Sequence, residues 1–256
     1  MSVVDIAKTQ SNNNAVMLEK LPKVYDAGKQ AEYNDFWDSI LLQSDGQPQT
    51  DYQFSFGGLS WNDKTFKPNH DIVPINARNM FINTRISNLK KNLEDCKVTL
   101  NTSLCKKCER MFYLSCVVEA PELDLAEAEH LNSICYQSRL LKSISFKISG
   151  SGEQTFVNSF VEANALTNIT FEGVIGQDID FSYSPLSVES MKSVISHLNE
   201  YLGKNDEWLH TVTFRDDCWE ALNNDSNSPP PLSEEDKTKG LTTWQDYVYY
   251  KLGWQY

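Results

Sequence analysis

One apolar pattern recurs four times between residues 93 and 175 of this 256-residue chain. Each copy has an apolar residue or proline at its first, fourth and sixth positions. The four copies are Leu93, Cys96 and Val98; Val118, Pro121 and Leu123; Leu141, Ile144 and Phe146; and Leu166, Ile169 and Phe171. The last two positions of each copy are two residues apart, which is the period of a strand with one buried face. We therefore expect each copy to form a short strand whose apolar side chains point into a shared interior.

Successive copies begin 25, 23 and 25 residues apart. These steps fall within the period of about 20–29 residues that is typical of leucine-rich repeats. A single repeat of this kind cannot bury its own apolar face, so neighbouring repeats have to stack. The pattern predicts an α/β fold: a leucine-rich-repeat solenoid of about four to five repeats. An N-terminal amphipathic helix and a helix-strand C-terminal cap complete this prediction.

The composition around the repeats divides the chain into five predicted parts. They are an N-terminal helical anchor (1–48), an aromatic N-terminal cap (49–92), the solenoid (93–186), a C-terminal cap (187–222), and a proline loop with an aromatic tail (223–256). In the C-terminal cap, Ser187 precedes an apolar stripe of helical period and Gly203 follows it, which predicts a helix between them. A strand is expected at 209–214.

An amphipathic helix is expected over residues 23–42, where apolar side chains recur at helical spacing. The apolar stripe consists of Tyr33, Phe36, Trp37, Ile40 and Leu41. One interpretation packs this stripe on the body of the protein itself. The other makes it an assembly anchor that docks the chain to a larger particle.

The strand residues between the interior positions are the candidate partner-binding residues, because they face the open side of a repeat array. They are Lys97, Thr99, Glu122, Asp124, Ser145, Lys147, Thr170 and Glu172. The alternative is that they are ordinary solvated strand residues.

The net charge of −12 and the pI of about 4.8 argue against nucleic acid and anionic membranes as partners. No apolar run reaches the roughly 18–20 residues of a membrane span, and the polar N-terminus does not resemble a signal peptide. The six cysteines, interpreted as free thiols, fit a protein that is made and kept in a reducing cytoplasm or assembled into a particle there.

The sequence offers no clear chemistry for catalysis, and no cofactor or metal is expected. Cys105 and Cys108 form a C-x-x-C pair, but a structural zinc site usually has a second such pair, so buried thiols are favoured and metal binding stays open. The four histidines form no metal signature, and nucleophile-elbow, Walker and dinucleotide motifs are missing.

Four longer phrases resemble a family of leucine-rich-repeat proteins encoded among the tail and structural genes of bacteriophages and prophages of gut Firmicutes. They are VYDAGKQAEYNDFWD (24–38), WNDKTFKP (61–68), LTNITFEGVIGQDIDF (166–181) and SPLSVESMKSVISHL (184–198). The resemblance implies a solenoid and a tail, baseplate or fibre-associated role in the virion. The chain departs from it in keeping a repeat asparagine only at Asn101, and in its proline loop and aromatic tail.

The first functional hypothesis is a non-enzymatic virion structural protein, made in the host cytoplasm. Its N-terminal helix would contact other tail proteins, and its repeats would serve host recognition by binding a host-surface protein or glycan; homo-oligomers are also open. The second hypothesis is an intracellular or cell-surface module for protein-protein interaction, such as an adhesin or an inhibitor of a host protein. A third interpretation is a carbohydrate-active protein that uses Trp61 and acidic residues.

Overall fold

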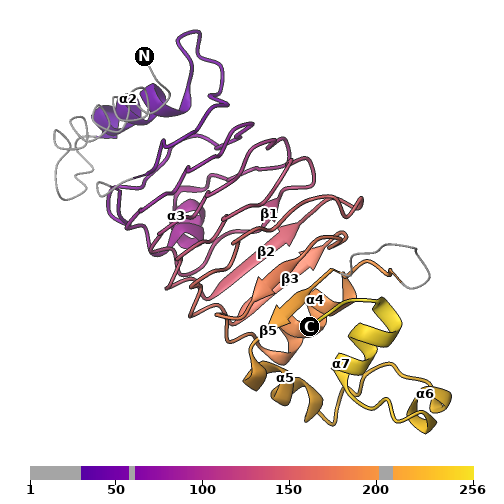
Figure 1. Ribbon diagram of the computed structural model, residues 1–256. Coiled ribbons are helices and arrows are strands. Elements are labelled where there is room, and N and C mark those ends of the chain that lie inside the picture. Colours follow the sequence, from indigo (N-terminus) through magenta and orange to yellow (C-terminus); the bar gives the residue numbers. More distant parts are fainter. Residues whose placement is uncertain (1–29, 58–60, 202–209) are drawn as a thin grey trace.

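The computed structural model describes residues 30–57, 61–201 and 210–256, and Figure 1 shows their arrangement. The helices are α2 (Gln30–Leu41), α3 (Leu89–Cys96), α4 (Val188–Ser196), α5 (Asp216–Asn223), α6 (Glu234–Thr238), α7 (Trp244–Tyr247) and the π-helix η2 (Val248–Leu252). The strands are β1 (Leu123–Asp124), β2 (Ser143–Lys147), β3 (Asn168–Glu172), β4 (Ile179–Phe181) and β5 (Val212–Phe214). Within these described residues, no helix is both long and apolar enough to cross a bilayer.

The strands form two separate parallel sheets. One has the order β1-β2-β3, and the other pairs β4 with β5. The register of the first sheet places Phe146 beside both Leu123 and Phe171, and all three side chains are buried. Because side chains alternate along a strand, the residues between them lie on the opposite, more exposed face. We call this exposed face of β1, β2 and β3 the sheet face.

The prediction of a leucine-rich-repeat solenoid with four to five repeats is wrong. The described residues form a mixed α/β structure with one three-stranded and one two-stranded parallel sheet and six α-helices. The strand after the fourth copy, β4, pairs with β5 instead of β3, so it does not extend the series. Only β2 and β3 contain both of the last two apolar positions of a copy.

The first copy of the pattern is helical. Its spacing is compatible with a helix as well as with a strand. Leu93 and Cys96 are three residues apart, which places them on one face of a helix as readily as on one strand. They lie at the end of α3, and Lys97 then ends the helix with a left-handed backbone, φ 58°. In the second copy, Pro121 has no N–H to donate to a ladder, and only Leu123 and Asp124 are in a strand.

The opposite long side of the molecule, which we call the turn side, consists of consecutive tight turns. Four segments follow the same backbone path, at 77–84, 108–115, 131–138 and 156–163. The third and seventh residues of each have positive φ: Asn79, Asn83, Arg110, Leu114, Ser133, Gln137, Asn158 and Glu162. A left-handed backbone costs a non-glycine residue about 1–2 kcal/mol. Backbone hydrogen bonds between neighbouring segments offset this cost, such as those from Phe81 N to Met111 O and from Phe112 N to Ile134 O, both 2.8 Å.

Phenylalanine rings of the turn segments stack in columns with rings from neighbouring parts of the chain, including β4 and β5. Phe81 stacks on Phe56 and on Phe112, with ring centroids 5.4 Å apart in each pair. Further along, Phe181 stacks between Phe160 and Phe214 at 4.6 and 5.8 Å. These fully or nearly fully buried rings supply much of the apolar burial that holds the turns in place.

Helix α2 closes one end of this core with its aromatic residues. Trp37 lies 4.9 Å from Trp61 and 5.6 Å from Phe66, measured between ring centroids. All three side chains are almost completely buried. The N-terminal part of the predicted anchor, residues 1–29, lies outside the described residues.

Helix α4 lies against β3 at the other end of the three-stranded sheet (Figure 1). Ser187 caps it as predicted, since its side chain accepts a hydrogen bond from the Ser190 backbone N–H at 3.2 Å. The hydroxyls of Ser190 and Ser193 accept hydrogen bonds from the backbone N–H groups of Ile169 (2.9 Å) and Phe171 (3.2 Å). The helix thereby accepts hydrogen bonds from two backbone N–H groups at the free edge of β3.

The segment predicted as a proline loop is partly helical. Ser233 and Asp236 form a capping box that starts α6. The Lys251 amine of η2 then forms an ion pair with the Asp236 carboxylate at 2.6 Å.

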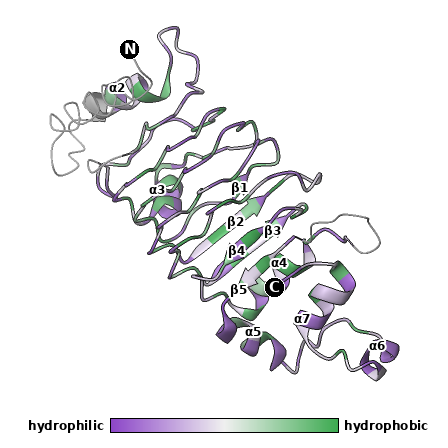
Figure 2. Cartoon of the chain, in the orientation of Figure 1, coloured by the Kyte–Doolittle hydropathy of each residue, from purple (hydrophilic) through white to green (hydrophobic). Residues whose placement is uncertain are grey.

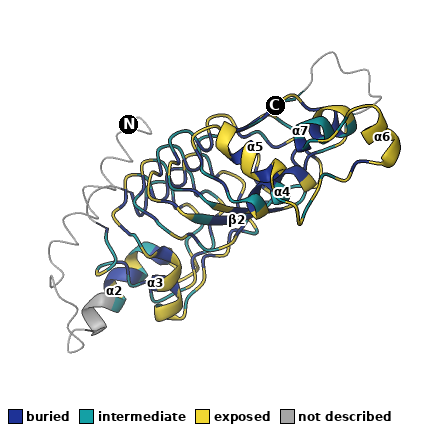
Figure 3. Cartoon of the chain, turned by 90° about the horizontal axis from the view of Figure 1, so that it is seen from below, coloured by how far each residue is buried: buried dark blue, intermediate teal, exposed yellow. Residues whose placement is uncertain are grey.

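In Figure 2, α6 is mostly hydrophilic whereas β2 is largely hydrophobic, and Figure 3 shows exposed residues on α5 and α6. The aromatic tail returns to the body: Trp254 is fully buried, and Gln255 pairs with Thr211.

Candidate functional site

The sheet face gathers most of the predicted partner-binding residues. Five of the eight are in its strands: Asp124, Ser145, Lys147, Thr170 and Glu172. A sixth, Glu122, directly precedes β1 and is exposed. Three strands therefore bring together on one surface residues that are up to 50 positions apart in the chain.

Two rows of polar side chains cross this face. In the first row, Ser145 pairs with Thr170 in the register, and the Thr170 hydroxyl donates to the Ser145 hydroxyl at 2.8 Å. In the second row, Lys147 stands between Asp124 and Glu172. The Lys147 amine forms an ion pair with the Asp124 carboxylate at 3.1 Å. Neutral hydrogen-bonding groups and charged groups thus lie side by side.

The electrostatics of the sheet face are set by one amine among three carboxylates. The pKa of Lys147 is raised by its hydrogen bond with Asp124 and by the negative charges of Asp124, Glu172 and Glu122. Lys147 therefore stays protonated at neutral pH. One positive and three negative charges leave the face acidic, which favours a partner that is basic or rich in hydroxyl groups.

The remaining two predicted residues are not in this sheet. Lys97 forms the C-cap of α3. The Thr99 backbone N–H donates to the Asp71 carboxylate at 2.7 Å, and the next residue, Leu100, forms a bridge with Ile72. Their prediction followed from treating the first apolar copy as a strand, which it is not.

Two further residues belong to the sheet face but were missed by the sequence analysis. Ser143 and Asn168 are register partners at the start of β2 and β3, and neither side chain is buried. They lie two positions before Ser145 and Thr170, so they share the same face. The alternation of the strands contained this signal, but the prediction covers only residues between and directly after the last two apolar positions of each copy, and Ser143 and Asn168 precede those positions.

The proposed assembly anchor on α2 is directed largely into the protein. Phe36, Trp37 and Leu41 are buried in the core, and Ile40 packs against it. The side chain of Tyr33 lies outside the described residues. The structure therefore places the described part of the stripe on the chain's own body, and it leaves those side chains little surface for a partner.

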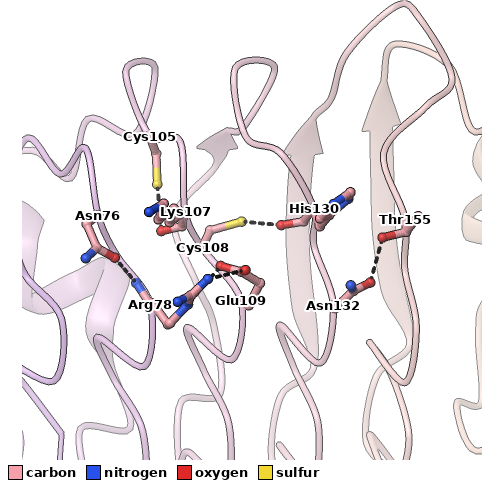
Figure 4. Close-up of polar contacts among 9 residues, drawn as sticks. All are labelled: Asn76, Arg78, Cys105, Lys107, Cys108, Glu109, His130, Asn132 and Thr155. Atoms are coloured by element: carbon pink, nitrogen blue, oxygen red, sulfur yellow. Dashed lines mark hydrogen bonds and ion pairs between the residues drawn. The ribbon is translucent and has the colours of Figure 1, made fainter. Parts of the chain in front are cut away.

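Both thiols of the C-x-x-C pair donate hydrogen bonds to backbone carbonyls. The Cys105 thiol donates to the Lys107 carbonyl at 3.4 Å, and the Cys108 thiol donates to the His130 carbonyl at 3.2 Å, as Figure 4 shows. Burial raises the pKa of Cys105 to about 11 and that of Cys108 well above its ordinary value, so both thiols stay protonated. Across the described residues, no three histidine, cysteine or acidic side chains are grouped so as to hold a metal ion.

Figure 4 also shows that the polar groups near this pair connect neighbouring turns. Arg78 donates to the Glu109 carboxylate with two nitrogens, at 3.2 and 2.5 Å, and Thr155 donates to the Asn132 side chain at 2.8 Å. Burial alone would raise the pKa of Glu109, but the hydrogen bonds from Arg78 outweigh it and the pKa is lowered. These groups stabilise the turn side, whereas the polar groups of the sheet face point outward.

Comparisons with protein-family models, with curated proteins and with solved structures each find no match for this chain.

The arrangement on the sheet face suits binding. Its strands carry hydroxyls, an amide, carboxylates and an amine in a fixed register, but no histidine or cysteine to activate a hydroxyl as a nucleophile. Trp61, the centre of the carbohydrate-active interpretation, is completely buried and presents no ring to a sugar.

Proposed function

We propose that this chain is a non-enzymatic binding protein that contacts a partner through the sheet face. The observation that carries the proposal is the register that aligns Asp124, Lys147 and Glu172, and Ser145 with Thr170, on one solvent-facing surface. The opposite face of the same strands is buried. Substitutions on the sheet face therefore alter recognition at little cost to the core.

The partner that fits this surface is basic or rich in hydroxyl groups. Three carboxylates around a single amine attract positive charge, and this attraction weakens with added salt. The hydroxyl row adds hydrogen-bond donors and acceptors without net charge. A protein or glycan on a bacterial surface, or a neighbouring tail protein, has this chemistry.

We place the chain in a bacteriophage virion as a tail, baseplate or fibre-associated protein. This part of the proposal is supported by the resemblance of its sequence phrases alone. Mass spectrometry of purified phage particles tests it: peptides of this chain are expected in stoichiometric amounts, and their absence would remove the chain from the virion.

The alternative is an intracellular or cell-surface interaction module that inhibits a host protein. A pull-down from infected cells separates the two functions. A virion part should recover tail proteins, whereas an inhibitor should recover one host protein in preference to them.

Substitution of Thr170 by Arg tests the binding surface itself. Thr170 is exposed at the middle of β3, so a long cationic side chain there obstructs the sheet face and reduces its negative charge. The full chain and the variant are compared for binding to the tail or host partner that those experiments recover. We expect at least a tenfold loss of affinity and an unchanged unfolding midpoint.

The matched control is Thr242→Arg, because Thr242 is an exposed threonine beside α7, outside the sheet. It should bind as the natural chain does. Equal affinities for the Thr170 variant, the Thr242 variant and the natural chain would rule out the sheet face as the contact.

A further inference from the structure

A pocket of about 480 Å³ lies at the C-terminal end of the molecule, between α4 and the α7 region. Figures 1 and 3 show these helices next to one another at the C-terminal end of the molecule. Helix α4 forms one wall, and the segment around Pro229 and Pro231, together with Trp244 and Tyr247, forms the other. Its volume is in the range of pockets that hold small molecules, roughly 300–1,000 Å³.

The α4 wall is a polar stripe with the apolar Ile195 beside it. Glu189, Lys192, Ser193 and Ser196 follow helical spacing and line the pocket. The opposite face of the helix, with Met191 and Val194, is buried in the core. The stripe is thus presented to the pocket by the same packing that fixes the helix.

The second wall is aromatic and apolar. The rings of Trp244 and Tyr247 meet edge to face, with centroids 5.8 Å apart and planes at 84°. The Trp244 indole N–H donates to the Ser228 carbonyl at 3.2 Å, so this polar atom is already satisfied. Both aromatic side chains line the pocket, together with the two prolines.

The charges around the pocket are predominantly negative. Lys192 is the one cation among the lining residues, and it is neutralised by an ion pair with Asp225 at 2.6 Å. Glu189 is exposed and forms no ion pair with any residue that the structure describes. Burial, together with the nearby Glu200 charge, raises the pKa of Tyr247, so its phenol stays neutral.

The two walls are fixed relative to each other through α5. The Asn223 side chain accepts a hydrogen bond from the Trp244 backbone N–H at 2.8 Å and donates to the Gln245 side chain at 2.6 Å. The Lys192–Asp225 pair connects α4 to the residues directly after the same helix. A preformed pocket of this kind loses little entropy when a ligand binds.

The geometry points to this pocket as a binding site for a small organic cation whose nitrogen carries methyl groups, such as a quaternary ammonium. Aromatic rings attract such a cation through the negative potential of their π faces. The Glu189 carboxylate adds charge complementarity, and the apolar wall accepts the methyl groups. Glu189 would repel an anionic ligand, and the lining cation, Lys192, is already paired with Asp225.

Choline and its neutral isostere 3,3-dimethylbutan-1-ol are the probes that test this inference, because they share a shape and differ in charge. The full chain is titrated with each by calorimetry, and saturation-transfer NMR reports whether the ligand methyl groups contact the protein. We expect choline to bind at least tenfold more tightly than the alcohol. Equal affinities, or no contact by choline, would overturn the assignment.

Glu189→Gln removes the proposed counter-charge while keeping the shape of the side chain. A surface charge interaction of about 1 kcal/mol corresponds to a roughly fivefold weaker affinity for choline. Glu220→Gln on α5 is the matched control, since Glu220 is exposed and does not line the pocket. The inference fails if the two variants bind choline equally well.

Tyr247→Leu removes one ring and leaves the pocket apolar, so choline affinity should fall while affinity for the alcohol stays within twofold. The Thr170 variant should bind choline as the natural chain does, because the sheet face is a different surface. The choline titration and the binding test of the Thr170 variant can therefore fail independently of each other.

Discussion

The sheet face and the turn side are built from successive passes of the same chain, yet they use their side chains differently. On β2 and β3 the buried positions alternate with partly or fully exposed ones, so every second side chain lies outside the core. On the turn side, polar groups connect neighbouring passes, as when the buried Ser159 hydroxyl donates to the Leu131 carbonyl at 2.8 Å. A surface that can change without loss of the fold is therefore found on the sheet and not on the turns.

The backbone also differs between the two sides. Strand residues occupy a favourable conformation and gain ladder hydrogen bonds directly. The turn side holds paired left-handed residues that are not glycine, such as Arg110 and Leu114, and relies on its neighbours to stabilise them. Substitutions that test backbone conformation should thus have different effects on the two sides.

The largest effect is expected where the chain leaves the sheet, at Gly173. Its φ is +114°, and a Cβ atom there would lie 2.2 Å from the Ile148 carbonyl oxygen. Gly173→Ala should reduce the free energy of unfolding by about 3 kcal/mol or more, because both the conformation and the close backbone contact exclude a side chain. Urea denaturation measures this loss.

Gly150→Ala provides the comparison for that variant. A Cβ atom at Gly150 would meet nothing within 4 Å. Its stability should stay within about 0.5 kcal/mol of the natural chain. Equal losses for the two variants would show that the passage from β3 to the next segment is not as constrained as we describe.

A smaller effect is expected at Asp63, which binds the two residues just before α3 from a distant part of the chain. Its carboxylate accepts hydrogen bonds from the backbone N–H groups of Ser87 (3.0 Å) and Asn88 (2.8 Å) and from the Asn92 side chain (3.1 Å). Asp63→Ala should destabilise the protein by about 1–2 kcal/mol, because it leaves these donors without their charged acceptor. Urea unfolding at pH 6 checks this value.

The contribution of Asp63 should also depend on pH. Partial burial raises its pKa, but the hydrogen bonds outweigh burial and the pKa of the folded state is lowered. The stabilisation is therefore present above the ordinary pKa of about 3.9 and is lost as the pH falls through the folded-state pKa. The stability gap between the natural chain and Asp63→Ala should narrow from pH 6 to pH 3, and a constant gap would contradict this account.

The smallest effect is expected on the turn side at Leu114, which is 41% exposed and has φ 56°. Asn83 holds the equivalent place in the preceding turn segment, and asparagine tolerates the left-handed region better than leucine does. Leu114→Asn should stabilise the protein by about 0.5 kcal/mol, whereas the β-branched Leu114→Val should cost about 1 kcal/mol. Thermal unfolding of both variants measures the difference, and a valine variant as stable as the asparagine variant would argue against a conformational cost.

Local periodicity correctly predicted the elements whose apolar residues follow a single helix or strand period. Ser187 and the apolar stripe after it gave the start of α4 correctly, and the alternation in β2 and β3 indicated which side chains face outward. The spacing of Leu93 and Cys96 was ambiguous between helix and strand, and tertiary packing decided for the helix.

No local sequence period marks the turn side or the pocket. Consecutive turns with left-handed Ser133 or Glu162 have neither glycine nor proline to mark them, because their conformation depends on hydrogen bonds to the next segment. The pocket joins Glu189 to Tyr247 across more than fifty residues, so its walls meet only in the folded chain.

The hydroxyls of Ser190 and Ser193 have a consequence for how the molecule behaves at high concentration. A parallel sheet that ends in unpaired N–H groups offers a template on which a strand from another copy can add, and such additions lead to aggregation. Here α4 occupies that edge, and the two serines take the hydrogen bonds of Ile169 and Phe171 that an incoming strand would need. Crowded copies of this chain can therefore display their sheet faces without growing into a shared sheet at β3.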